Sequence, residues 1–112
     1  MPVFSIWESR FPREHLERGR AVTEAIWQEM PAFDGYLRHA LVEDLDDPGH
    51  LFVISEWESR EAADKVLADY AGNPNARLAN ELVSEPRRRT VGRRLGSENY
   101  PWGTGGQAAS AS

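Results

Sequence analysis

The side chains best suited to chemistry in this 112-residue chain are aromatic, cationic and imidazole groups, because it contains no cysteine. Thiolate catalysis and thiolate metal sites are therefore excluded. His39 is the best candidate proton acceptor, since imidazole titrates near neutral pH and a half-buried site tunes its pKa; the alternative is that it only hydrogen-bonds locally. Neither a phosphate-binding glycine loop, a zinc signature nor a flavin motif is present, so we expect no cofactor and no metal.

The elements that position these groups are indicated by a repeat of Trp-Glu-Ser-Arg at residues 7–10 and 57–60. Each copy follows an apolar, β-rich run and precedes a stretch with helical periodicity. A repeated strand-to-helix junction predicts two β-α-β units, which is the split arrangement β-α-β-β-α-β called ferredoxin-like. The predicted fold class is α+β, with a four-stranded antiparallel sheet.

The expected strands cover about residues 2–10, 36–43, 51–57 and 88–95, and the first helix about 13–30. The second helix begins after Ser59, a plausible N-cap, and Gly72-Asn73-Pro74 interrupts it before it ends near residue 83. Residues 1–95 form the predicted domain. Residues 96–112, rich in Gly, Ser, Ala and Thr, are expected to be a flexible tail. An alternative is that Tyr100-Pro101-Trp102 docks on a second subunit.

Composition and net charge indicate which classes of binding partner the protein is expected to have. The formal net charge of −5 argues against nucleic acid and anionic membranes. Arg87, Arg88 and Arg89 form the one basic cluster, which we interpret as a strand with solvated side chains rather than a nucleic-acid patch. No apolar run reaches the length of a transmembrane helix and no secretory signal is visible, so cytoplasm is the expected compartment.

Strand alternation predicts a dimer. In the strand 51–57, Phe52, Ile54 and Glu56 share one face, and Val53, Ser55 and Trp57 share the other. Helices can cover only one face, and no further segment remains for the second apolar face. A two-fold homodimer that pairs sheet against sheet would bury it. Glu56 on that face needs a partner, and Arg38 is available.

Three stretches of the sequence carry a resemblance to a known family: residues 30–36 (MPAFDGY), 56–62 (EWESREA) and 73–77 (NPNAR). In these stretches the chain resembles the antibiotic biosynthesis monooxygenase superfamily, the dimeric α+β barrels, over roughly residues 2–95. The resemblance implies a small cofactor-independent monooxygenase that converts an aromatic polyketide-type substrate, such as an anthrone or phenol, to a quinone with O₂ in natural-product biosynthesis. It also implies a small aromatic substrate and a homodimer.

The resemblance also assigns roles to residues. Trp57 matches a tryptophan of the polyketide oxidases, and Arg77 matches a helix-borne arginine. Where those relatives often carry an asparagine, four residues before the tryptophan, this chain has Val53. That departure favours two alternatives: a polyketide cyclase or dehydratase that uses the same pocket without O₂, or a non-catalytic ligand-binding member. A heme-degrading branch uses a histidine on the second helix, but the approximate ligand position here is Asn80, a poor iron ligand.

We expect the site in each subunit, between the sheet and its own helices. The candidate catalytic residues are Trp57, Arg77 and His39. The candidate substrate-binding residues are Trp27, Tyr36, Val53, Ser55 and Tyr70. Such a cavity would be aromatic and apolar, which suits a flat phenolic ligand.

Overall fold

The computed structural model describes residues 1–96, so the Tyr100–Trp102 segment and nearly all of the expected tail lie outside the described residues. The chain forms a four-stranded sheet from β1 (Val3–Arg10), β2 (Tyr36–Glu43), β3 (His50–Trp57) and β4 (Arg88–Gly92). The helices are α1 (Leu16–Glu29), α2 (Arg60–Tyr70) and α3 (Pro74–Leu82). Short 3₁₀ helices, η1 (Arg13–His15) and η2 (Met30–Ala32), flank α1.

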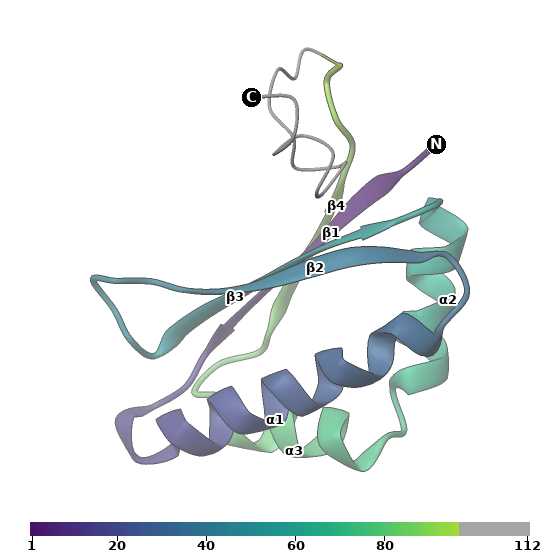
Figure 1. Cartoon of the computed structure of the whole chain (residues 1–112). Coiled ribbons are helices and arrows are strands. Elements are labelled where there is room, and N and C mark those ends of the chain that lie inside the picture. The colour runs from purple at the N-terminus through teal and green to yellow at the C-terminus, as the bar shows by residue number, and fades with distance from the viewer. Residues whose placement is uncertain (97–112) are drawn as a thin grey trace.

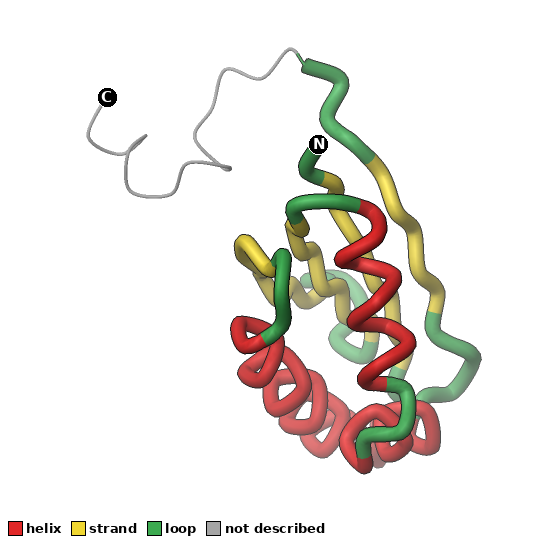
Figure 2. The backbone as a smooth tube through the Cα atoms, turned by 90° about the vertical axis from the view of Figure 1, so that its right-hand side faces the viewer, coloured by secondary structure: helices red, strands yellow, loops and turns green. Residues whose placement is uncertain are grey.

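The strand order is β2-β3-β1-β4 with every neighbouring pair antiparallel, which confirms the predicted ferredoxin-like α+β fold. Figures 1 and 2 show the three helices on one side of the sheet, with α1 and α3 side by side. The other side of the sheet is left open within the described chain. None of the helices in residues 1–96 is both long and apolar enough to span a membrane.

Local sequence explains where the helices begin. The Ser59 hydroxyl accepts a hydrogen bond from the Ala62 amide at 3.1 Å, which confirms Ser59 as the N-cap of α2. The Asn73 side chain accepts one from the Asn75 amide at 2.8 Å, and Pro74 occupies the first turn of α3. The predicted interruption is therefore real, and two separate helices cross the sheet.

Gly35 lies in the turn between η2 and β2 and packs against the start of α2. Its φ is +85°, and a Cβ at this position would lie 2.5 Å from the Cβ of Ala62, so only glycine fits. Its carbonyl accepts a hydrogen bond from the Glu58 amide at 2.8 Å. This contact fixes the start of β2 against the end of β3, next to Tyr36 and Trp57.

The repeated Trp-Glu-Ser-Arg does not mark equivalent positions, contrary to the expectation. Residues 7–10 lie inside β1, where Trp7 pairs with Val53, whereas Trp57 ends β3 and Ser59 caps α2. The copies are thus offset along their strands by several residues. What they share is the direction of the tryptophan side chains, because Trp7 and Trp57 both line the space between sheet and helices.

The predicted alternation along β3 is confirmed. Val53, Ser55 and Trp57 are buried beneath the helices. Phe52, Ile54 and Glu56 face the open side of the sheet, and so do the residues that pair with them in β1 and β2. The apolar residues of this open face are Phe4, Ile6, Ala40, Val42, Phe52 and Ile54. Glu56, on the same face, accepts a 2.8 Å hydrogen bond from Arg38, the partner that the sequence suggested.

Candidate functional site

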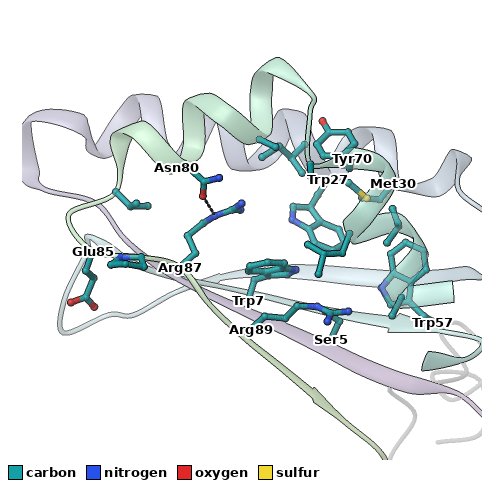
Figure 3. A pocket seen from close by; sticks show the side chains of 18 of the residues that line it. Ser5, Trp7, Trp27, Met30, Trp57, Tyr70, Asn80, Glu85, Arg87 and Arg89 are labelled. Atoms are coloured by element: carbon teal, nitrogen blue, oxygen red, sulfur yellow. Dashed lines mark hydrogen bonds between the residues drawn. The ribbon is translucent and has the colours of Figure 1, made fainter. Parts of the chain in front are cut away.

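A cavity of about 630 Å³ lies between the sheet and the helices, a volume within the usual range for small-molecule sites. Figure 3 shows it from close by. Side chains of β1, β3, β4 and all three helices line it, together with the segment that joins α3 to β4. They are Ser5, Trp7, Ile26, Trp27, Met30, Trp57, Ala63, Val66, Leu67, Tyr70, Ala71, Ala76, Asn80, Val83, Ser84, Glu85, Pro86, Arg87 and Arg89.

One end of the cavity is aromatic and its polar atoms are already satisfied. Trp57, only 1% exposed, donates its indole N–H to the Ser55 hydroxyl at 3.0 Å. That hydroxyl in turn donates to the Ser5 carbonyl at 3.0 Å. This chain of hydrogen bonds holds the Trp57 ring in place and leaves its N–H occupied. Trp57 therefore forms a wall of the cavity rather than a donor to a ligand.

His39 and Tyr36 lie behind this wall. The His39 ring is 5.4 Å from that of Trp27, and the Tyr36 ring is 5.6 Å from that of Trp57, centroid to centroid. The Tyr36 hydroxyl and His39 Nδ1 are 2.5 Å apart. Burial lowers the pKa of His39; it also raises the pKa of Tyr36, an effect that the Arg38 charge partly offsets. Both shifts favour the neutral groups, so the Tyr36 hydroxyl can donate a hydrogen bond to the neutral imidazole.

Tyr70 lines the cavity through its ring, as predicted, but not through its hydroxyl. That hydroxyl donates to a Glu29 carboxylate oxygen at 2.7 Å, at the end of α1. Burial and the hydrogen bond to Glu29 raise the pKa of Tyr70 to about 12. The phenol therefore stays protonated at neutral pH and acts as apolar wall.

The other end of the cavity is cationic. The Arg87 guanidinium lies 4.8 Å from the centroid of the Trp7 ring, in cation–π range, and its Nε donates to Asn80 Oδ1 at 2.8 Å. Figure 3 shows it between these two residues, projecting into the cavity. Arg89, also in the lining, is paired with Asp64 at 3.0 Å.

The structure brings together only part of the site expected from the sequence. Trp27, Trp57 and Tyr70 line the cavity. Val53 and Ser55 lie in the buried layer of β3 outside the lining, with Ser55 positioning Trp57.

His39, Tyr36 and Arg77 are also absent from the cavity wall. The expectation that Arg77 reaches the cavity is wrong in this structure, because its side chain is exposed on α3. Ala76 and Asn80 occupy the side of α3 that lines the cavity. His39 pairs with Ser55 on the side of the sheet that faces the helices, and its ring contacts that of Trp27, but it does not line the cavity.

The lining residues that the sequence did not indicate as site residues include Trp7, Asn80, Arg87 and Arg89. The sequence suggested Asn80 only as the position of a heme ligand, and Arg87 and Arg89 only as solvated side chains of a strand. Of the basic cluster, only Arg88 is exposed, whereas Arg87 and Arg89 are partly buried. The period-two alternation that places Arg89 on the same face as Trp7 was the available signal.

No group of three or more His, Cys, Asp or Glu side chains in residues 1–96 is arranged to hold a metal ion. The cavity instead combines aromatic walls with two arginines, an asparagine and serines. Such a site suits a flat aromatic ligand that carries oxygen substituents.

Comparisons with known proteins agree on the family. The model of the antibiotic biosynthesis monooxygenase family matches residues 2–68, more than half of the chain. The chain therefore belongs to this family, and the resemblance noted in the sequence is confirmed. A comparison with curated proteins gives no match.

Solved structures share the fold. A crystal structure of an antibiotic biosynthesis monooxygenase has a TM-score of 0.75 at 19% identity, covering 83% of this chain and 98% of its own. Rv0793 from Mycobacterium tuberculosis has a TM-score of 0.71 at 25% identity, and the match covers 88% of this chain and 100% of Rv0793. SnoaB, a cofactor-independent oxygenase from Streptomyces nogalater solved as a mutant, has a TM-score of 0.65 at 19% identity. This match covers 86% of this chain and 95% of SnoaB.

Proposed function

We propose that this protein is a cofactor-independent monooxygenase that oxidises an aromatic polyketide-type substrate, an anthrone or a phenol, in natural-product biosynthesis. The observation that carries the proposal is the aromatic-walled cavity between the sheet and the helices, in a chain of the antibiotic biosynthesis monooxygenase family. SnoaB, which has the same fold, is described as a cofactor-independent oxygenase.

The chemistry asks little of individual side chains. An electron-rich carbanion or phenolate can itself reduce O₂, so the protein has to bind it away from water and favour its anionic form. Trp7, Trp27 and Trp57 supply the flat walls. The positive charge at the other end of the cavity attracts an anionic ligand. His39 does not line the cavity, so the proton released from the substrate passes to water.

A second candidate is a cyclase or dehydratase that uses the same cavity without O₂. The observation that favours it is the absence of a free donor on the cavity side of β3 within the described chain. Val53 has no polar group, and the Trp57 N–H is bound to Ser55. Stabilising a reduced oxygen species would therefore depend on other residues.

We also propose that the open face pairs two subunits. The apolar residues of this face, Phe4, Ile6, Ala40, Val42, Phe52 and Ile54, are only partly buried in one chain. An apolar surface of this extent is unusual on a monomer and a two-fold dimer would cover it. Light scattering at micromolar concentration tests the proposal, and a single species of 12.6 kDa would refute it.

The test of function is mass spectrometry of products from a panel of anthrones and linear polyketide intermediates, in air and under argon. A monooxygenase gives a product with one oxygen atom gained and two hydrogen atoms lost, only in air. A cyclase gives a dehydrated product in both atmospheres. No conversion of any panel member in either atmosphere would count against both enzymatic candidates and favour a binding protein.

A further inference from the structure

The cationic end of the cavity contains an arginine, Arg87, whose charge is not balanced by any carboxylate within residues 1–96. The chain has 18 acidic and 13 basic residues other than histidine, so carboxylates are plentiful. At this end, Arg89 is paired with Asp64, and Glu85 is paired with Arg10 at 3.3 Å. Arg87 has no carboxylate partner among residues 1–96.

The contacts that Arg87 does make orient it without neutralising it. A guanidinium has five N–H donors, and the 2.8 Å bond to Asn80 uses only the one on Nε. The contact with Trp7 is a cation–π contact, with Cζ 4.8 Å from the ring centroid, and it supplies no counter-charge. Both terminal nitrogens therefore have no acceptor within the part of the chain that the structure describes.

This arrangement is costly without a ligand. Burial lowers the pKa of Arg87, which reflects the desolvation of its charge. Desolvated charges in proteins are normally paired with an opposite charge. An anion that enters the cavity would supply the missing partner, and a planar group with two oxygens matches the guanidinium edge.

We propose that Arg87 is a specificity-determining residue that binds a carboxylate on the substrate, so that the ligand is an aromatic carboxylic acid. This inference rests on the proposed function in taking the cavity as the substrate site. The aromatic part lies along Trp7 and Trp27, and the carboxylate meets the two terminal nitrogens of Arg87. Asn80 is a positioning residue that fixes the guanidinium through Nε.

A carboxylate fits this role better than a phenolate. A carboxylic acid ionises near pH 4 and is anionic at neutral pH, whereas a phenol ionises near pH 10 and is anionic in only about one molecule in a thousand. A permanent anion gains the full attraction of the guanidinium without first losing a proton. The reacting phenol or C–H group is then a separate part of the same molecule.

The experiment compares two probes of similar shape by isothermal titration calorimetry: naphthoate, which is anionic, and naphthamide, which is neutral. The wild-type protein is expected to bind naphthoate about ten- to a hundredfold more tightly, the range for a charge-assisted hydrogen-bonded pair. Arg87→Met keeps much of the stem over Trp7 and removes the charge, and should abolish this preference. Arg18→Met, a matched charge change at an exposed position of α1, should preserve it.

A second variant tests the same inference independently, in case Arg87→Met does not fold. Asn80→Asp is nearly isosteric and places a carboxylate beside Arg87 Nε, which gives the guanidinium an internal counter-ion. It should fold, bind naphthamide as before and lose the preference for naphthoate. Equal affinity of the wild type for both probes, or unchanged preference in Arg87→Met or Asn80→Asp, would overturn the inference.

The two proposals fail separately. Binding of naphthoate through Arg87 in a protein that converts no substrate in air would leave the carboxylate site intact and refute the oxygenase. Conversion of neutral anthrones in air, with no preference for acids, would refute the carboxylate site and leave the oxygenase intact.

Discussion

Each face of the sheet contains one histidine, and the pKa values of the two are shifted in opposite directions. His39 faces the helices, and burial lowers its pKa. His50 is on the open face, between the Asp44 carboxylate at 3.1 Å from Nδ1 and the Glu8 carboxylate at Nε2. Burial alone would lower the pKa of His50, but these two carboxylates outweigh it and raise that pKa.

The arginines differ in the same way. On the open face, Glu56 is 2% exposed and is paired with Arg38 at 2.8 Å and Arg94 at 3.1 Å. On the covered face, the partners of Arg87 among the described residues are Asn80 and Trp7, neither of which is charged. The buried carboxylate of the open face is thus paired within the chain, as a structural role requires. The covered face keeps a charge that a ligand can balance.

Removal of the Trp57 side chain should have the largest effect and test whether the covered face is also the core. Trp57→Ala removes a ring that is 1% exposed and should lower the free energy of unfolding by about 3–5 kcal/mol. Urea denaturation measures this loss. Trp57→Phe should keep the fold and weaken ligand binding or turnover. A loss below 1 kcal/mol for Trp57→Ala would show that the ring is not part of the core.

A charge in the centre of the open face should separate the subunits without unfolding them. Ile54→Glu places an unpaired carboxylate from each subunit in the proposed interface and should weaken association by about 2–5 kcal/mol. Light scattering across a dilution series measures the shift to monomer. Leu45→Glu, the same change at a 95% exposed turn position, is the control. Equal effects of the two variants would contradict an interface on the sheet.

The two histidines should give stability opposite pH dependences. The raised pKa of His50 means that its contribution is full below its unfolded pKa, near 6.5, and is lost as pH rises through the folded pKa. The lowered pKa of His39 means that its contribution is present above about pH 6.5 and is lost as pH falls through its folded value.

Urea unfolding between pH 5 and 8.5 of the wild type, His50→Gln and His39→Gln separates these effects. Each should be at most about 1 kcal/mol, because Glu8 and Asp44 are about a third exposed and screened by solvent. His50→Gln should steepen the rise of stability with pH, and His39→Gln should reverse it. Unchanged pH profiles in both variants would contradict the assigned shifts.

Substitution of Arg77 should have the smallest effect. Its side chain is exposed on α3 and outside the cavity, so Arg77→Ala should change the free energy of unfolding by less than about 0.5 kcal/mol. Turnover of a verified substrate should stay within about twofold, which corresponds to a similarly small energy. A large loss of turnover in a stable variant would restore the role that the resemblance implied for Arg77.

Features that depend on residues close in sequence could be predicted. The N-cap at Ser59, the break at Pro74 and the alternation along β3 follow from backbone hydrogen bonding and strand geometry. The repeat of Trp-Glu-Ser-Arg led to the correct fold for an incorrect reason, since its copies are not structurally equivalent. The fold prediction was correct because both β-α-β units have the same order of strands and helices.

The sequence by itself determined the family, the element order and the aromatic wall around Trp57, because apolar periodicity and capping act over a few residues. Only the tertiary structure decided which polar groups meet in the cavity. Arg87 lies just before β4 and is brought over Trp7 because β4 pairs with β1, while Asn80 approaches from α3. Arg77 points elsewhere because Ala76 and Asn80, four residues apart, are the residues of α3 that line the cavity, and one residue beyond Ala76 the helix has turned by about 100°.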